Sequence, residues 1–445
     1  MTTLMQMSRE AHGAHEFTVD WPQLIRRGPR PLAFATVEEL DNGCSNKFCA
    51  QFGGCRMRAT LVRAHPVAGR ANVPTDHAKS FVLGLLDAAG VELDGPGPGD
   101  IHVHDERFYE RIVRDRELGL GESYQDGWWD AEQVDEFIAK VQIADLASRV
   151  KPGRRVMSVA LRGQLQNRQT VRRAARNASA HYDIGNDLYE RMLDTRMIYS
   201  CGYWNDAADL DAAQEAKLDL ICAKLGLEPG MRLLDIGCGW GGLARFAAER
   251  YGARVTGISP ATRQVEVARR RCAGLNVDIQ QCDFRHVEGR YDRIVSVGML
   301  EHVGPKNYDA FFAANARLLT QDGMALHHTI GSNMPQHATD PWFDKYIFPG
   351  GVIPSLDQVA HATRGHWAIE DVHNFGPDYD RTLMAWHANI EGAWDDLPNY
   401  DERFRRTWRY YLLSSAGSFR VRELQLWQVV FSRARRRSHV YRAVR

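Results

Sequence analysis

The sequence has no apolar run long enough to cross a membrane. A spanning helix needs about 20 consecutive apolar residues, and polar or charged residues interrupt every hydrophobic stretch before that length. The N-terminus also lacks the basic start, the apolar run and the small-residue cleavage site of a secretory signal. These absences argue against an integral membrane protein and against a secreted one, so we expect a cytoplasmic protein.

Net charge is absent as well, because 56 Lys and Arg residues balance 56 Asp and Glu residues. No global electric field then attracts the chain to nucleic acid, and we expect no nucleic-acid partner. Attraction to an anionic bilayer has to come from local basic runs, which lie at residues 26–30, 154–155, 172–176 and 433–437. Each of these runs is more often an ordinary solvated surface.

The eight cysteines do not show the spacing of a disulfide framework, which suits a reducing compartment. Three of them, Cys44, Cys49 and Cys55, could in principle form a thiolate metal cluster. Their spacing matches no zinc pattern, however, and a fourth ligand is missing. We therefore expect no metal site.

The hydrophobic pattern divides the chain into four segments. Residues 1–78 show no sustained period of 2 or 3.6, which predicts a poorly ordered extension. Residues 79–145 predict a small N-terminal domain, with an amphipathic helix in SFVLGLLDAAGVEL, a short strand in IHVH and a helix in DERFYERIVRD. A linker at residues 146–178 then leads to the larger domain, residues 179–445.

The larger domain alternates strands and helices. Five strands are predicted in MRLLDIG, ARVTGIS, VDIQQCD, YDRIVSVGM and GMALHHTI, and two more in HWAIEDVHNF and LQLWQVVFS, with two aromatic-rich helices between the last two. Asp211 is a plausible N-cap for a helix over residues 212–225. This order predicts an α/β fold with a doubly wound, right-handed parallel sheet, whose ligand binds at the carboxyl ends of the strands.

A glycine-rich turn follows the first strand of this domain, in LLDIGCGWGG. Gly237, Gly239 and Gly241 allow a ligand to approach the main chain closely. The G-x-G-x-G spacing, with Asp235 inside the strand, fits a nucleoside methyltransferase better than the dinucleotide pattern G-x-G-x-x-G. The second strand also ends without the acidic residue that usually holds a dinucleotide ribose. Asp283, after the third strand, is placed either to meet an adenine amino group or to remain a solvated strand-end residue.

Four polar residues are candidates for chemistry, although each also has an ordinary structural interpretation. Cys201 can be a small buried apolar residue and His328 a core histidine. Glu301 can cap the following turn, and Tyr379 can be a hydrogen-bonding group at the surface. Because Glu301 and His328 follow the fourth and fifth strands, on the same sheet edge as the glycine turn, we expect them to converge on the ligand.

From about Lys79 to the C-terminus, roughly four-fifths of its length, the chain resembles the bacterial cyclopropane-fatty-acyl-phospholipid synthases. The motifs that carry this resemblance are GLGESYQDGWW, HYDIGNDLYERMLD, YSCGYW, LLDIGCGWGG, VSVGMLEHVGPKNYD, LHHTIGS, KYIFPGG, HNFGPDYDRTLMAW and LQLWQVVFSR. The resemblance implies a class I methyltransferase with a Rossmann-like sheet and a small N-terminal domain. It also implies transfer of a methylene group from S-adenosylmethionine to the cis double bond of an unsaturated phospholipid acyl chain, which forms a cyclopropane ring.

The same resemblance implies the partners and the cofactor pocket. The protein would be peripheral on the inner face of the membrane, would contact the bilayer surface and would form a homodimer. Asp235 would support the glycine turn, and the S-adenosylmethionine pocket would be lined by Tyr199, Ser200, Gly237, Ser259, Gln264 and Asp283.

A bound bicarbonate ion is also implied, as the acceptor of the proton lost when the ring closes. Glu301 and His328 would anchor the ion. Cys201 and Tyr379 would add contacts, and Ile330 would offer its backbone N–H. Because a carboxylate beside bicarbonate is a like-charge pair, a proton has to lie between the two.

The reaction also needs a dry site, since water would trap the carbocation formed from the alkene. Aromatic side chains suit a transient cation because their faces are negative and unreactive. Ordinary core packing is the other interpretation of each of the aromatic candidates, which are Tyr199, Tyr203, Trp204, Trp342, Tyr346 and Phe348.

Two other functions have to be weighed against ring formation. A related methyltransferase could act on an acyl chain or a small amine and stop at methylation. A lipid-binding protein without catalytic activity is the other alternative. The small domain and the complete bicarbonate set favour the cyclopropane synthase.

Overall fold

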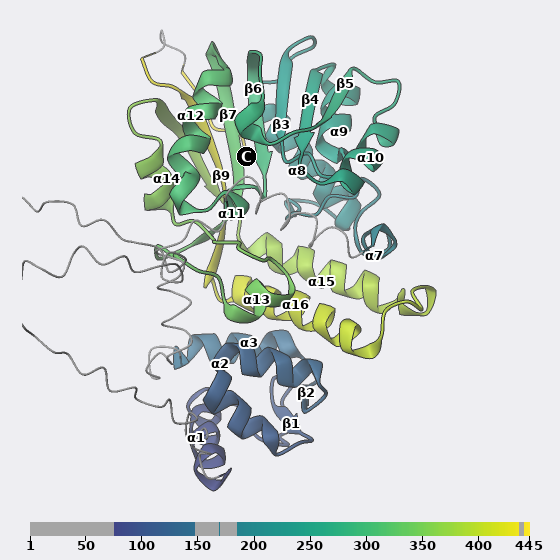
Figure 1. The fold of residues 1–445 in the computed structure, drawn as a ribbon, viewed down its shortest axis with the longest axis vertical. Helices are drawn as coiled ribbons and strands as arrows, with labels where there is room; N and C mark the ends of the chain where they lie inside the picture. The colour runs from purple at the N-terminus through teal and green to yellow at the C-terminus, as the bar shows by residue number, and fades with distance from the viewer. Residues whose placement is uncertain (1–74, 147–168, 170–184, 436–439) are drawn as a thin grey trace, which may run out of the picture. The chain divides into compact units, whose positions relative to one another are not determined.

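The computed structural model describes residues 75–146, 169, 185–435 and 440–445 (Figure 1). Most of the expected extension, its three cysteines and nearly all of the expected linker lie outside the described residues, as do three of the four basic runs. Residues 71–445 belong to one compact unit. Within the described part of this unit, no helix combines the length and the apolar character needed to span a membrane.

Residues 75–146, the first described stretch of this unit, contain three helices and a two-stranded sheet. Its elements are α1 (Thr75–Ala88), β1 (Ile101–Val103), α2 (Arg107–Gln125), β2 (Trp129–Ala131) and α3 (Val134–Ile143). The buried Trp129 packs against Tyr124 and Phe137, each at a ring-centroid distance of 5.0 Å. This cluster supplies the core of a segment that is too small to bury much apolar surface otherwise.

Helix α2 is longer than the sequence predicts, because the GLGESYQ segment continues it. The chain bends at Arg116, where φ is 55°. Gly121 on this helix leaves no room for a Cβ atom, since the indole of Trp342 packs directly against it. This close approach brings α2 against a helix from the larger part of the chain.

The remaining elements form the larger α/β part. Its helices are α7 (Asn186–Met192), α8 (Leu210–Lys224), α9 (Gly242–Tyr251), α10 (Thr262–Arg271), α11 (Leu300–Val303), α12 (Tyr308–Leu318), α13 (Pro341–Tyr346), α14 (Leu356–Ala362), α15 (Pro377–Glu391) and α16 (Glu402–Arg420), and its strands are β3 (Arg232–Ile236), β4 (Arg254–Ser259), β5 (Val277–Gln281), β6 (Tyr291–Val297), β7 (Leu319–Ser332), β8 (Trp367–Asn374) and β9 (Leu424–Arg433). The 3₁₀ turns are η3 (Phe284–His286), η4 (Pro305–Asn307) and η5 (Trp394–Asp396).

The first turn of α8 corrects one sequence expectation. The N-cap is Asp209 rather than Asp211, and its side chain accepts a hydrogen bond from the backbone N–H of Ala212 at 2.9 Å. Asp211 instead accepts hydrogen bonds from the backbone and hydroxyl of Thr195. Both aspartates suit the positive end of a helix, so the sequence alone does not separate them.

The seven strands form one sheet in the order β5-β4-β3-β6-β7-β9-β8. Neighbouring strand residues face opposite sides, since Leu233 joins a core cluster with α8 and α9 while Leu234 joins another with α12. Helices therefore cover both faces, which confirms the doubly wound fold (Figure 1).

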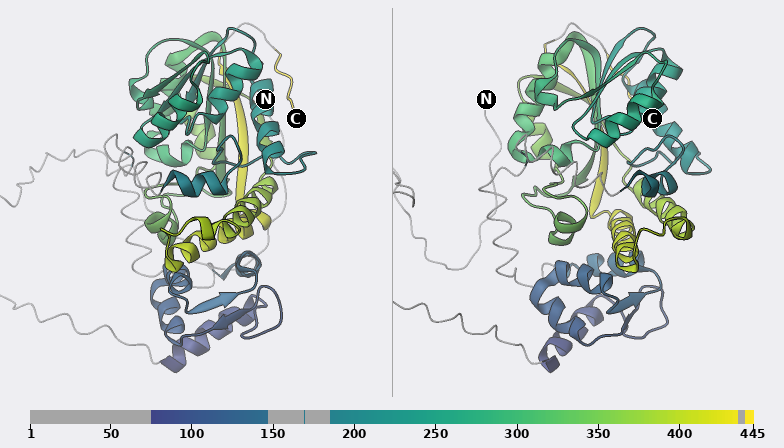
Figure 2. Two further views of the ribbon diagram at one scale, coloured as in Figure 1. Left: turned by 90° about the vertical axis from the view of Figure 1, so that its right-hand side faces the viewer. Right: turned by 45° about the vertical axis from the view of Figure 1, so that its right-hand side comes forward.

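The sequence predicts a parallel sheet, but the observed sheet is only partly parallel. The strands from β5 to β7 run parallel, but β9 is antiparallel to both β7 and β8. The reason is the connection after β8, where α15 and α16 pair with each other near the end of the strand instead of crossing back along a face (Figure 2). The chain therefore enters β9 from the end at which it left β8. Helix α16 contacts α2 and α3 as well as β9.

Candidate active site

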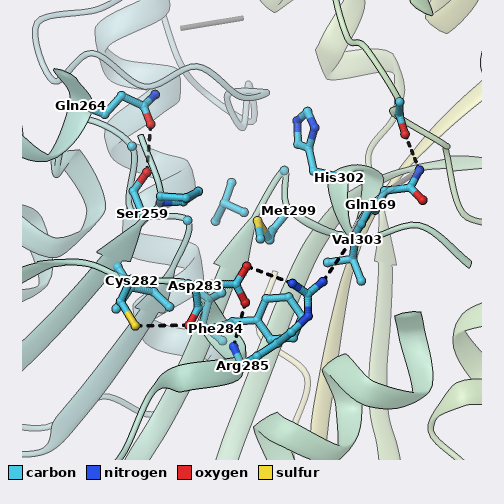
Figure 3. Close-up of a pocket in the computed structure, with 18 of the residues that line it drawn as sticks. Gln169, Ser259, Gln264, Cys282, Asp283, Phe284, Arg285, Met299, His302 and Val303 are labelled. Carbon is cyan, nitrogen blue, oxygen red and sulfur yellow. Dashed lines mark hydrogen bonds and ion pairs between the residues drawn. The ribbon is translucent and has the colours of Figure 1, made fainter. Parts of the chain in front are cut away.

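A pocket lies at the carboxyl ends of four neighbouring strands, where the parallel order places a ligand site (Figure 3). Its walls come from the turns after β3, β4, β5 and β6 and from a loop near Gly350. The lining residues are Gln169, Ile236, Gly237, Gly239, Ile258, Ser259, Pro260, Gln264, Cys282, Asp283, Phe284, Arg285, Val297, Gly298, Met299, His302, Val303, Pro349 and Gly350.

The glycine turn after β3 needs glycine for two different reasons. Gly237 has a φ of 87° and Gly239 a φ of 53°, and both line the pocket. The backbone N–H groups of Gly237 and Cys238 donate to the carbonyl of Ile258, which ties the turn to β4. Gly241 does not line the pocket. It begins α9 at a φ of 84°, and a Cβ atom there would lie 3.0 Å from the sulfur of Cys272.

Two polar side chains line the pocket beyond β4. The hydroxyl of Ser259 donates to Oε1 of Gln264 at 3.2 Å and accepts from the backbone N–H of Ala261 at the same distance. Both Ser259 and Gln264 are buried. The amide nitrogen of Gln264 and the remaining capacity of the Ser259 hydroxyl can therefore meet a polar ligand.

Asp283 lines the pocket on the side of β5, and both of its carboxylate oxygens already have a partner. One accepts from the backbone N–H of Arg285 at 3.0 Å and the other from its guanidinium at 3.1 Å (Figure 3). The carboxylate is thus fixed in orientation, and each oxygen keeps a free lone pair for a further donor such as an adenine amino group.

The expected cofactor residues Tyr199, Ser200 and Asp235 do not line this pocket. The hydroxyl of Tyr199 donates to that of Tyr411 at 2.8 Å, and the hydroxyl of Ser200 accepts from the ammonium of Lys217 at 2.9 Å. Asp235 is fully buried in β3, and burial raises its pKa to about 7. One of its oxygens has no hydrogen-bond partner within the described part of the chain.

Several lining residues were not identified from the sequence. The side-chain amide of Gln169 donates to the carbonyl of Gly350, and its backbone carbonyl accepts from the guanidinium of Arg285 at 3.2 Å. It lies in a basic stretch without a motif, so only the tertiary contact reveals it. His302, the residue after Glu301, also lines the pocket (Figure 3). Burial lowers its pKa to about 4, so the imidazole is neutral at physiological pH.

Glu301, the residue before the pocket-lining His302, contacts Ile330 of β7. Glu301 belongs to α11 after β6, and its Oε1 accepts a hydrogen bond from the backbone N–H of Ile330 at 2.6 Å. Its other oxygen, Oε2, is buried and has no partner among the described residues. Burial raises the pKa of Glu301 to about 7. A carboxyl group is therefore poised between its two protonation states near neutral pH.

His328 lies in β7, two residues before Ile330, and is 2% exposed. Its Nδ1 lies 3.4 Å from the side-chain amide of Gln428, and its Nε2 has no partner within the described part of the chain. Burial, together with the nearby positive charges of Lys217 and Lys224, holds the pKa of His328 well below its usual range. The imidazole is therefore neutral and can offer Nε2 to a ligand in either tautomer.

Helix α15 carries Tyr379 and also contacts Cys201. The hydroxyl of Thr382 is 3.8 Å from the sulfur of Cys201, and Tyr379 is one turn earlier on the same helix. Burial raises the pKa of Cys201 well above its usual value, so its thiol is neutral. Phe375 packs edge-on against both His328, at 5.7 Å, and Tyr203, at 5.3 Å, and thereby joins the strand residues to this group.

All six aromatic candidates belong to one apolar cluster. The rings of Phe348 and Tyr411 lie 5.8 Å apart, and Tyr199 is hydrogen-bonded to Tyr411. His302, on the pocket wall, packs against Phe348 at 6.0 Å. An aromatic wall therefore extends from the pocket toward α16. Within the described ranges, no group of three His, Cys, Asp or Glu residues is arranged to hold a metal ion.

Comparisons with known proteins identify relatives of this chain. The profile of the family described as "Mycolic acid cyclopropane synthetase" matches residues 169–429. The chain is 49% identical over 364 residues to the "Cyclopropane-fatty-acyl-phospholipid synthase" of Escherichia coli K12, which covers 81% of this chain and 95% of that protein. It is 33% identical to the "Tuberculostearic acid methyltransferase UfaA1" of Mycobacterium tuberculosis, over 77% of this chain and 85% of the relative.

Among solved structures, the mycolic acid cyclopropane synthase CmaA1 complexed with SAH and CTAB is similar, with a TM-score of 0.54 and 33% identity. The match covers 58% of this chain and 97% of that one. Coclaurine N-methyltransferase bound to N-methylheliamine and SAH has a TM-score of 0.59 at 24% identity, over 70% of this chain and 98% of that one, which shows a shared fold.

Proposed function

The chain belongs to the mycolic acid cyclopropane synthetase family, and on that premise we propose how its residues support the reaction. It is an S-adenosylmethionine-dependent methyltransferase that transfers a methylene group to the cis double bond of unsaturated phospholipid acyl chains, which forms a cyclopropane ring. The observation that carries this conclusion is the 49% identity to the E. coli synthase over 95% of that protein. Similarity of that extent goes well beyond a shared nucleotide-binding turn.

We propose that the pocket after β3 to β6 binds S-adenosylmethionine, which supplies an electrophilic methyl group when bound. The pocket residues fit this molecule. The open backbone at Gly239 leaves space for close approach, and Ser259, Gln264 and Asp283 offer polar groups for a nucleoside. Ile236, Ile258 and Met299 are among the apolar lining residues that can flank a purine ring. Tyr199, Ser200 and Asp235 would act from behind the wall by holding the loop and the turn in place.

Bicarbonate is the proposed proton acceptor, and two buried polar atoms support this proposal. Oε2 of Glu301 and Nε2 of His328 are buried without a partner among the described residues, and leaving such groups unpaired costs free energy. Glu301 in its protonated form can share its proton with the anion, which removes the like-charge repulsion. The N–H of Ile330 is donated to Glu301, so this residue would orient the carboxyl group rather than bind the ion alone.

Exclusion of water is the proposed role of the aromatic cluster. The cluster includes Tyr199, Phe348 and Trp342, and Trp342 is 1% exposed. Such rings present negative faces to an acyl-chain cation and offer no nucleophile to trap it. Cys201 and Tyr379, both buried beside this cluster, would complete the polar contacts of the ion.

The finer location and assembly are proposals as well. Because the acyl chains of the substrate lie within a bilayer, we propose that the protein works as a peripheral enzyme at the inner face of the membrane. We also propose a homodimer, an N-terminal domain over residues 79–145 and a catalytic domain over residues 179–445. Exposed apolar side chains at Phe81, Ile143 and Met334 are available for contact with lipid or with a second copy.

The deciding experiment is lipid analysis after incubation of the purified full chain with unsaturated phospholipid vesicles and S-adenosylmethionine. Ring formation adds one CH₂ and removes the double bond. A methyl branch or a methylated head group would instead support a methyltransferase that stops earlier. This alternative needs the test because one relative, 33% identical, is named a methyltransferase.

A further inference from the structure

One face of α8 holds the YSCGYW loop, residues 199–204. The side-chain amide of Gln214 donates to the backbone carbonyl of Ser200 at 2.8 Å, and the ammonium of Lys217 donates to the Ser200 hydroxyl at 2.9 Å. The N–H of Tyr203 donates to the carbonyl of Ala213 at 2.9 Å. Helix α8 thus positions the loop that carries Ser200, an expected cofactor contact, and Cys201, an expected bicarbonate contact.

Lys217 is unusual among these contacts because it carries a buried charge. It is 1% exposed, and its hydrogen-bond partner is the neutral hydroxyl of Ser200. No carboxylate of the described chain lies within ion-pair distance of its nitrogen, although Asp194 and Asp235 are close enough to act on it electrostatically. Burial lowers its pKa to about 8. An ammonium in this position is costly unless an anion compensates it.

A second buried lysine on the same helix provides the contrast. Lys224 is also 1% exposed, but its nitrogen lies 3.7 Å from a carboxylate oxygen of Asp371 and 2.9 Å from Nδ1 of His373. Its charge is therefore compensated locally. The charge of Lys217 is not compensated in this way, which points to an anion that joins the site with the reactants.

The field of Lys217 reaches the proposed bicarbonate site. Lys217 acts electrostatically on Cys201, the residue after its hydrogen-bond partner, and on His328. The five residues assigned to the ion provide a carboxyl group, a neutral imidazole, a thiol, a phenol and a backbone amide, but no cation. A buried anion needs a positive potential to offset its lost hydration.

We propose that Lys217 is a positioning residue that supplies the positive charge of the bicarbonate site while holding Ser200 in place. This inference rests on the proposed function, since it assumes that an anion accepts the proton. It extends that function by naming the group that makes a buried negative charge tolerable at this site.

Two substitutions on the same helix separate the charge from the hydrogen bond. Lys217→Met removes the charge at similar length, and Lys217→Gln does so with a polar group if the first variant folds poorly. Gln214→Met is the matched control, because it removes a hydrogen bond to the same residue without changing the charge. Each full-length variant is assayed for initial methyl transfer to unsaturated phosphatidylglycerol vesicles, in carbon-dioxide-depleted buffer with bicarbonate added back. Titration calorimetry gives the affinity for S-adenosylmethionine.

For the Lys217 variants we expect the half-saturating bicarbonate concentration to rise about tenfold or more, with partial recovery of the rate at high bicarbonate. For Gln214→Met we expect a half-saturating concentration within about twofold of the wild type. Lys217 variants that lose rate at an unchanged half-saturating concentration would overturn the inference and leave a purely structural role. If the wild type forms rings without any dependence on bicarbonate, bicarbonate is not the proton acceptor. If the wild type forms no rings, the proposed function is wrong.

Discussion

The backbone N–H of Ile330 donates a hydrogen bond of 2.6 Å to Oε1 of Glu301. This bond fixes the carboxyl group of α11 against β7, the strand that also carries His328. The second carboxyl oxygen remains buried and without a partner among the described residues. Glu301 is therefore oriented by the backbone on one side and available for chemistry on the other.

Glu301 is predicted to reduce the stability of the protein above neutral pH. Its pKa rises from 4.5 to about 7 on folding, so the folded state binds the proton more tightly than the unfolded state. The stabilisation is complete below the unfolded pKa and is lost as the pH rises through 7. The shift corresponds to roughly 3 kcal/mol of unfolding free energy at alkaline pH.

Glu301→Gln removes this titration because the amide stays neutral. Relative to the wild type, we expect the variant to gain stability between pH 5 and pH 8, by at most roughly 3 kcal/mol. The gain is smaller if the new amide N–H is also left without a partner. Urea unfolding at the two pH values measures the difference. A difference between variant and wild type that does not change with pH would show that Glu301 does not titrate in this range.

Asp283 is predicted to contribute to cofactor binding through its fixed carboxylate. Asp283→Asn removes the charge and should weaken S-adenosylmethionine binding by about 10- to 100-fold, the usual effect of losing a hydrogen bond to a charged group. Asp278→Asn is the matched control, because this exposed aspartate lies within β5 and does not line the pocket. Calorimetry on both variants decides the matter. Equal affinities for the two would exclude a direct contact from Asp283.

The contact between α2 and α13 is predicted to stabilise the fold. Glu122 accepts from Arg111 at 2.7 Å, from Lys345 at 2.6 Å and from the hydroxyl of Tyr346 at 3.0 Å. Glu122→Gln should lower the free energy of unfolding by about 1 to 3 kcal/mol, since it removes the charge partner of Lys345 and one of the two carboxylates that pair with Arg111. Glu117→Gln, an exposed change on the same helix, is the control.

The effect of Glu122 should also depend on pH. Its hydrogen bonds with Lys345 and Arg111 hold its pKa below the usual value despite burial. The stabilisation is therefore present above the unfolded pKa of 4.5 and is lost as the pH falls through the lower folded value. Denaturation curves for the wild type and Glu122→Gln should converge on acidification, and a constant separation would contradict this account.

Vesicle binding is predicted to weaken as salt increases. The net charge is zero, so attraction to an anionic bilayer has to come from local basic residues, each worth about 1 kcal/mol near the surface. Sedimentation with anionic vesicles at low and high salt measures the effect, and zwitterionic vesicles serve as the control. Binding to anionic vesicles that is insensitive to salt would indicate insertion of apolar side chains instead.

Much of the fold could be predicted because its signals are local. Alternating apolar segments located the seven strands, and the glycine spacing after β3 located the pocket. The direction of β9 could not be predicted in this way, since its apolar pattern is the same for either direction. The choice between Asp209 and Asp211 as N-cap also depended on the path of the preceding chain, which no local pattern records.

The sequence predicts the position of candidate site residues only where they lie near the end of a predicted strand. Glu301 and His328 were placed near the same edge from strand order alone. Gln169 and Lys217 could not be recognised from the sequence. Gln169 is identified only by its contact with Gly350, which is distant in sequence, and Lys217 only by its contact with Ser200 in the loop before α8. The bond between Ile330 and Glu301 was also not foreseen, since a backbone N–H has no sequence signature.

The proposed role of Glu301 in proton removal is the central claim about the mechanism. Glu301→Gln keeps the size of the side chain while removing its ability to exchange a proton with the anion. Loss of a positioned acid–base group typically lowers the rate by roughly 10²- to 10⁴-fold. The pocket residues Ser259, Gln264 and Asp283 are unchanged in this variant, so binding of S-adenosylmethionine should persist.

The most direct test compares initial rates of methyl transfer to unsaturated phospholipid vesicles for the wild type and Glu301→Gln, alongside calorimetric titration of S-adenosylmethionine. We predict a rate lower by at least about 100-fold with cofactor affinity within about twofold of the wild type. We also predict that the wild type loses activity in carbon-dioxide-depleted buffer and regains it when bicarbonate is added. A variant with a near-normal rate would remove Glu301 from the mechanism, and a variant that no longer binds the cofactor would show that its role is structural.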